Sequence, residues 1–87
     1  MAILKEVTSF EDIKVQIVTS FPDICIYVTK NKSEAEHSDF IWYYDNSFAK
    51  RKIKFVTGLP DLKIQYVTSK SLAGWKNHTH KLQNRIG

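Results

Sequence analysis

The sequence predicts one small, mainly β domain with short helical turns, built from a short internal repeat. Its 87 residues are enough for a single hydrophobic core. A composition of 43% hydrophobic and 25% charged residues is that of an ordinary globular protein and not of a disordered chain. A motif of the form Val-Thr-x-x-x-Asp recurs at spacings too short for a unit that holds both a strand and a helix.

The repeat is clearest in three segments. Residues 7–13 read Val-Thr-Ser-Phe-Glu-Asp-Ile, residues 18–24 read Val-Thr-Ser-Phe-Pro-Asp-Ile, and residues 56–62 read Val-Thr-Gly-Leu-Pro-Asp-Leu. The marker valines stand at positions 7, 18, 28, 56 and 67, and Tyr44-Asp45 is a degenerate copy inside the longest gap. Units of about 10 to 16 residues hold one strand and one turn, so we expect a series of strand-and-turn units.

Patterns of apolar residues predict the strands in chain order. The first, over Ile3 to Val7, is the weakest. Residues 13–17, 53–55 and 62–66 alternate between apolar and polar, which indicates strands with one buried and one solvated face. Residues 24–28 and 40–44 are apolar on both faces and should lie where both faces are covered. We therefore expect six strands at most.

The short connectors carry a Phe/Leu-Pro-Asp sequence that favours a tight turn. Pro22 and Pro60 pre-set φ for the first turn position. The carboxylates of Asp23 and Asp61 can each accept a hydrogen bond from the backbone just ahead. We expect these aspartates to act locally, within their own turns.

The longer connectors carry Ser-x-Ala, at 33–35, 47–49 and 71–73. A serine before an alanine and charged residues suits the capped start of a helical turn. After Gly74, four residues keep near-helical spacing: Trp75, Thr79, Leu82 and Ile86. This spacing predicts a short amphipathic helix at the C-terminus.

The strand-and-turn units, together with the ending Ala73-Gly74-Trp75-Lys76-Asn77, resemble the septoil-knot domain family, whose function is unassigned. The resemblance runs from about Ile13 to Leu82, and the Ala-Gly-Trp-Lys-Asn ending is its most specific part. It implies a fold in which the backbone winds around itself into a deep seven-crossing, or 7(1), torus knot. It implies no catalytic residue, substrate or cofactor.

The residues alone leave the topology open among a small β-meander, a β-solenoid fragment and a compact barrel. Chains rarely thread through their own loops, so general topology rules do not lead to a knot. The first copy of the repeat departs from the pattern, because Glu11 stands in place of the proline. We therefore divide the chain into residues 1–10, an N-terminal segment that could be flexible, and residues 11–87, a single knotted repeat domain.

Compartment is indicated by what the chain lacks. The start, Met1 to Glu6, turns to charged residues after a few apolar ones, and no apolar stretch is long enough for a signal peptide or a membrane span. The single cysteine, Cys25, cannot form an internal disulfide, which fits a reducing compartment. We expect a cytoplasmic protein with no membrane partner.

Metal binding is the first candidate chemistry. His78 and His80 flank Thr79, and His37 or Cys25 could supply further ligands. Residues two apart on a helix point to different faces, so the pair is poorly spaced for shared ligation. We interpret the two histidines as solvated side chains and predict no metal and no cofactor.

Catalysis has little support in the sequence. Cys25 lies between two isoleucines and is interpreted as a small core residue. A cluster of carboxylates beside an imidazole could carry general acid-base chemistry, but it also fits an ordinary polar loop: Glu34, Glu36, His37 and Asp39. An enzyme would need a polar pocket around His37 or Asp45. Three glycines cannot form a phosphate-binding loop, and we predict no enzymatic activity.

The net charge of +4 is concentrated in two basic runs. The residues that could contact nucleic acid or an acidic partner are Lys50, Arg51, Lys52, Lys54, Lys76, Lys81 and Arg85. Basic side chains near aromatic ones are typical of single-strand binding, but the aromatic residues of this chain are better explained as core. A solvated lysine surface is the alternative interpretation.

These observations favour a monomeric, mechanically and kinetically stable scaffold or binding module of unknown partner, without catalytic activity. The alternative is a weak, salt-sensitive nucleic-acid-binding protein that uses the two basic runs.

Overall fold

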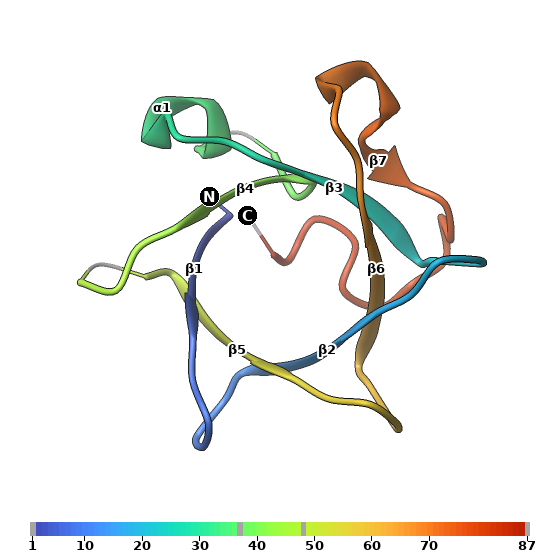
Figure 1. The fold of residues 1–87 in the computed structure, drawn as a ribbon, viewed down its shortest axis with the longest axis horizontal. Helices are drawn as coiled ribbons and strands as arrows, with labels where there is room; N and C mark the ends of the chain where they lie inside the picture. The colour runs from blue at the N-terminus through green and yellow to red at the C-terminus, as the bar shows by residue number, and fades with distance from the viewer. Residues whose placement is uncertain (1, 37, 48, 87) are drawn as a thin grey trace.

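The protein is a closed barrel of parallel strands. The computed structural model describes residues 2–36, 38–47 and 49–86. The strands are β1 (Ile3–Glu6), β2 (Ile13–Ile17), β3 (Ile24–Val28), β4 (Ile41–Tyr44), β5 (Arg51–Phe55), β6 (Leu62–Tyr66) and β7 (Gly74–Trp75). The first six pair in parallel in the order β4-β1-β5-β2-β6-β3, and a further β4–β3 pairing closes the ring, as Figure 1 shows.

All the predicted strands are present, within two residues at either end, and β7 was not expected. It is a two-residue strand that pairs antiparallel with β3. Strand β1, predicted to be the weakest, lies between β4 and β5, with Ala2 and Leu4 fully buried. A boundary at residue 10 therefore separates β1 from the barrel to which it belongs.

The chain fills the ring in two interleaved laps. Strands β1, β2 and β3 occupy alternate positions, and β5 and β6 later fill the gaps between them. The register explains how a short turn can join two parallel strands. Glu6, at the end of β1, and Ile13, at the start of β2, are both paired with Ile53 of β5. The next strand therefore begins level with the end of the last one, on the far side of a single intervening strand.

The same relation holds at three more turns. Ile64 separates Ile17 from Ile24, Val15 separates Phe55 from Leu62, and Leu4 separates Tyr44 from Arg51. Among barrel strands that follow one another in the chain, only β3 and β4 lie side by side. Their connection therefore has to return along the strand direction. That connection is longer and contains α1 (Lys32–Ala35), as parallel neighbours usually require.

The core is organised in layers because alternate residues of every strand point inward. The middle layer takes one residue from each barrel strand, and all six are 0% exposed: Leu4, Val15, Ile26, Trp42, Ile53 and Ile64. These side chains belong to one apolar cluster. Burial of this layer is the main favourable contribution to the stability of the barrel.

The aspartates of the short connectors act across strands, so the prediction of local turn bonds was wrong. The carboxylates of Asp12, Asp23 and Asp61 accept hydrogen bonds from the backbone N–H groups of Lys52, Lys63 and Lys14, each at 2.9 Å. The backbone N–H groups of the same aspartates donate to the carbonyls of the same lysines, at 2.8 to 2.9 Å. Each aspartate thus ties its turn to the strand that the turn crosses.

The longer connectors form helical turns at two of the three expected places. Helix α1 is capped by the Asn31 side chain, which accepts from Ser33 N, so the cap lies two residues before the predicted serine. The 3-10 helix η1 (Lys70–Leu72) is capped in the same way by Ser69. The third Ser-x-Ala segment includes residue 48, which lies outside the described residues.

The predicted C-terminal helix is absent, and residues 81–85 form turns. Their backbone bonds join residues three apart, as from Gln83 to His80 and from Arg85 to Leu82, and Asn84 has a φ of 65°. The apolar spacing correctly identified residues that are buried: Ile86 is fully buried and Leu82 packs against the core. Turns place these side chains inward without an α-helix.

The C-terminal segment, residues 77–86, closes the end of the barrel where the strands begin. The guanidinium group of Arg51 donates to the carbonyl of Arg85 at 3.0 and 3.2 Å, and His80 Nε2 lies 2.9 Å from the carbonyl of Asp61. Arg51 opens β5, and Asp61 directly precedes β6. In Figure 1 the later part of this segment, drawn in red, lies within the outline of the ring.

Replacing Ile86 tests the closing role of this segment. We expect Ile86→Ala to lower the free energy of unfolding by about 2 to 5 kcal/mol, because a fully buried side chain is lost. Ile17→Ala is the matched control, since Ile17 is 51% exposed and should cost well under half as much. Urea unfolding followed by circular dichroism measures both, and equal losses would contradict the closing role.

Candidate functional site

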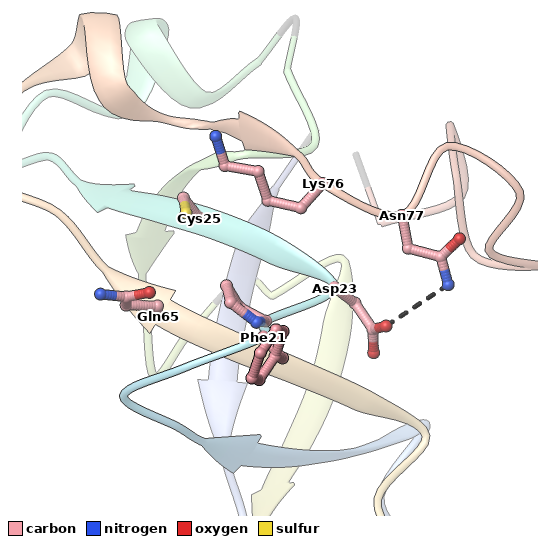
Figure 2. Close-up of a pocket in the computed structure, with 7 residues that line it drawn as sticks. Phe21, Asp23, Cys25, Gln65, Lys76 and Asn77 are labelled. Carbon is pink, nitrogen blue, oxygen red and sulfur yellow. Dashed lines mark hydrogen bonds between the residues drawn. The ribbon is translucent and has the colours of Figure 1, made fainter.

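A cleft of about 520 Å³ lies beside the start of β3. Its walls come from the β2–β3 turn, from β3 and β6, and from the residues after β7, as Figure 2 shows. The lining residues are Phe21, Pro22, Asp23, Cys25, Gln65, Lys76 and Asn77. Lys76 is therefore the one residue of the predicted basic set that lines this cleft.

Asp23 forms hydrogen bonds to several segments that line or adjoin this cleft. Its carbonyl accepts from the backbone N–H groups of Lys76 and Asn77 at 2.8 and 2.9 Å. Its carboxylate accepts from Lys63 N at 2.9 Å, and Asn77 Nδ2 lies 3.5 Å from Oδ1, the contact drawn in Figure 2. Asp23 is therefore committed to anchoring the chain after β7 onto β3.

His80 is likewise engaged in structure. Its Nδ1 accepts a hydrogen bond from Leu82 N at 3.1 Å, which leaves the proton on Nε2, facing the Asp61 carbonyl at 2.9 Å. The ring stacks on Trp75, with centroids 5.6 Å apart. The lone pair that a general base would use already accepts a backbone N–H.

Cys25 lies on the wall of this cleft, which the sequence did not indicate. Its side chain is 6% exposed and points outward from β3, between Ile24 and Ile26, which point inward. Figure 2 shows the thiol beneath the chain that carries Lys76. Neither of the two described histidines, His78 and His80, lines this cleft.

The predicted acid-base cluster is dispersed among structural contacts. Glu34 accepts from the Thr29 hydroxyl at 2.8 Å and pairs with Lys70. Asp39 is buried, and its Oδ2 accepts from Trp75 Nε1 at 3.1 Å and from Asn84 N. Asp45 lies 3.8 Å from Lys32 and accepts from Ser47 N. His37 lies outside the described residues.

Two absences apply to the described part of the chain alone. Among residues 2–36, 38–47 and 49–86, no three His, Cys, Asp or Glu side chains converge as a metal site would require. Over the same ranges, every helix is too short and too polar to cross a membrane.

The predicted basic residues separate into different regions. Arg51 and Arg85 lie together on a second hollow of about 310 Å³, which Asp12, Ile13 and Leu82 also line. Lys81 is exposed in the C-terminal segment, and Lys50 is exposed just before β5. The predicted set thus does not form one surface.

A larger basic surface runs across four neighbouring strands. Lys52 and Lys54 of β5 pair in register with Lys5 of β1 and Lys14 of β2, and Lys63 follows on β6. We call these five residues the lysine belt. None of them forms a salt bridge with a residue that the structure describes. Like charges side by side on neighbouring strands repel, so this surface favours a bound anion.

The basic residues predicted from the sequence as contacts did not include Lys5, Lys14 and Lys63, although these complete the belt. In the sequence they are isolated lysines in separate strands. The signal was their alternation with apolar residues, which indicated an outward direction without the strand order that aligns them.

The opposite end of the barrel, where the strands end, carries a tyrosine pair. The hydroxyl groups of Tyr44 and Tyr66 lie 2.8 Å apart. The pKa of Tyr44 is raised well above its ordinary value, chiefly by burial and then by the hydrogen bond with Tyr66. The pKa of Tyr66 is also raised, chiefly by burial, with a further contribution from Glu6. Both phenols stay neutral in the folded protein at physiological pH.

This pair predicts a loss of stability in alkaline solution. A tyrosine of the unfolded chain loses its proton near pH 10, whereas Tyr44 in the folded protein keeps it. Its contribution is complete below pH 10 and falls by about 1.4 kcal/mol per pH unit above it. Denaturant unfolding from pH 8 to 11.5 should show a steeper fall for the natural protein than for Tyr44→Phe.

Tyr43→Phe is the control, because the Tyr43 hydroxyl makes no hydrogen bond within the part of the chain that the structure describes. It should keep the steep alkaline fall. Parallel curves for the natural protein and Tyr44→Phe would contradict the raised pKa.

Comparison with known proteins extends this description. No curated protein matches the chain. A family model described as the 7(1) septoil knot domain matches residues 1–76, which include β1 to β7 and end within the Ala-Gly-Trp-Lys-Asn segment. The match includes the N-terminal strand that the sequence analysis had set apart. The chain belongs to the septoil knot domain family.

Proposed function

We propose that this protein is a kinetically and mechanically stable scaffold, without catalytic activity, whose chain forms a seven-crossing torus knot. The family match supports the knot, because the family is described by it. The interleaved laps of the chain support it as well, since the β4–β5 and β5–β6 turns pass over strands already laid down in the first lap. Unfolding would then require a terminus to be drawn back through several passes.

The hydrogen bonds at the crossings support slow unfolding. At three crossings a turn is tied to the strand beneath it by a pair of bonds between an aspartate and a lysine backbone. Pulling on one terminus loads these bonds one after another, while the buried middle layer resists separation of the strands. Resistance to unfolding is therefore the property that the geometry supports best.

The closed barrel supports a monomer. A ring of paired strands leaves no free edge along which a second chain could add. The engaged states of Asp23 and His80 support a non-catalytic role, because the polar groups nearest the larger cleft already serve the fold.

Degradation by an ATP-driven protease tests the scaffold function. With a degradation tag on the C-terminus, we expect degradation at least about tenfold slower than that of an unknotted β domain of equal stability. The rate of loss is measured on gels under saturating ATP. Ile86→Ala serves as an internal control. It should remain slower than an unknotted domain matched to its lower stability, and equal rates would contradict the proposal.

The alternative function is weak binding to nucleic acid. The observation that favours it is the lysine belt, whose members form no salt bridge with a described residue. If about five lysines contact phosphates, affinity for a DNA duplex should fall at least about a hundredfold between 50 and 200 mM salt. Fluorescence anisotropy measures this dependence. Replacing the five belt lysines by glutamine should flatten it, whereas replacing Lys76, Lys81 and Arg85 should not. A twofold loss over this salt range would exclude the alternative.

A further inference from the structure

Three large apolar side chains stand almost fully in solvent at the tips of turns. Phe10, Phe21 and Leu59 are 90%, 91% and 93% exposed. Each occupies the fourth position of the Val-Thr-x-Phe/Leu motif. Large apolar side chains with so little cover at corresponding turn positions call for a partner.

The backbone at these tips makes the choice of residue more unusual. The φ angles of Phe10, Phe21 and Leu59 are 58°, 53° and 52°, in the left-handed region. Asparagine or glycine adopts this region with less strain, and bulky side chains seldom occupy it. The turn geometry therefore does not explain the apolar residues, and nothing within the described chain covers them.

Each tip projects beside an outward-pointing lysine. The turn with Phe10 is bonded to the backbone of Lys52 through Asp12, and the turn with Leu59 is bonded to Lys14 through Asp61. The turn with Phe21 is bonded in the same way to Lys63, through Asp23. All three lysine side chains are exposed, and none of their ammonium groups forms a salt bridge with a described carboxylate.

The three units lie next to one another. They cross β5, β2 and β6, which are consecutive in the barrel, so the order is Phe10 with Lys52, Leu59 with Lys14 and Phe21 with Lys63. Figure 1 shows the corresponding turns projecting outward from one half of the ring. The rim of the barrel thus carries three exposed apolar tips, each on a turn that crosses a strand at an exposed lysine.

We propose that this rim docks on the surface of an anionic lipid bilayer. The apolar tips enter the interfacial region, and the lysines contact the phosphate and carboxylate head groups. Separate tips between cations fit a bilayer, which admits individual side chains, better than a flat protein surface. Leu59 also offers no ring for stacking on a base, so the tips do not fit nucleic acid. Surface docking needs no membrane-spanning segment, and it revises the expectation of no membrane partner.

Co-sedimentation with lipid vesicles tests this inference. We expect binding to vesicles containing phosphatidylserine, about fivefold weaker for each lysine removed, and little binding to pure phosphatidylcholine. The variant with Phe10→Asn, Phe21→Asn and Leu59→Asn should bind at least about tenfold more weakly. Asparagine tolerates positive φ, so this variant keeps the fold, as its melting temperature will verify. Replacing Lys14, Lys52 and Lys63 by glutamine should also weaken binding.

Matched controls test whether binding depends on the three tips and the three lysines beside them, which we call the array, or only on total charge and exposed apolar area. Leu72→Asn removes a side chain that is 58% exposed on η1, away from the array, and should leave binding unchanged. Replacing Lys30, Lys70 and Lys81 by glutamine removes the same charge at positions that share no turn or cleft with the tips, and it should cost clearly less. Loss of vesicle binding in the lysine variant together with full retention in the tip variant would overturn the proposal and indicate a general polyanion surface. Absence of binding to anionic vesicles would overturn it as well.

The outcome is independent of the scaffold function. The tip variant keeps every strand pairing and every aspartate–lysine bond, so its resistance to the protease should equal that of the natural protein. Failure of lipid binding with retained resistance would reject the docking surface alone.

Discussion

The structure depends on one relation of register: at four of the five connections between barrel strands, a strand ends level with the start of the next. Parallel strands normally need a long return connection, because the chain has to travel back along the strand direction. Here Ile53 is the common neighbour of Glu6 and Ile13, so the turn between β1 and β2 has only to pass over one strand. Because the chain moves on around the ring at each such turn, it does not have to travel back along the strand. A parallel barrel can therefore form without a helix in every connection.

This relation explains what the repeated residues do. The inward alternate positions supply the buried middle layer, and the aspartate before each of β2, β3 and β6 fastens its turn to the strand below. The residue after that bond must leave the turn and enter the next strand at once. The left-handed residue two places before the aspartate lies within this turn, and Phe10, Phe21 and Leu59 share this backbone conformation. The repeat thus encodes a crossing as well as a strand.

The sequence was sufficient for the local structure and insufficient for relations across the barrel. Alternation located β2, β5 and β6, because a half-buried strand leaves that pattern in the residues themselves. The bonding of Asp61 to Lys14 depends on strand order, which no local pattern contains, so this aspartate was assigned to its own turn. The expectation of a knotted chain came from the resemblance to a known family, because the general rule against threading does not lead to it.

The lysine belt was predicted only in part, for related reasons. The run from Lys50 to Lys54 was visible as a local charge, but its partners Lys5, Lys14 and Lys63 lie in other strands and join it only through the barrel. Phe10, Phe21 and Leu59 were noted as members of the repeat, yet a large apolar residue in a sequence is normally read as core. The helical spacing after Gly74 identified Ile86 as buried and gave the wrong conformation, because turns can present the same side chains inward.

The most specific part of the family resemblance turns out to serve closure of the fold. Gly74 and Trp75 pair with β3, Lys76 and Asn77 bond to the Asp23 carbonyl, and Trp75 also donates to Asp39. These backbone and indole bonds fasten the C-terminal segment over the end of the barrel. A sequence signature of this kind reports how the chain is held together. Function is therefore better sought at side chains that the fold does not need for packing or hydrogen bonding. The turn tips and the outward lysines are such side chains.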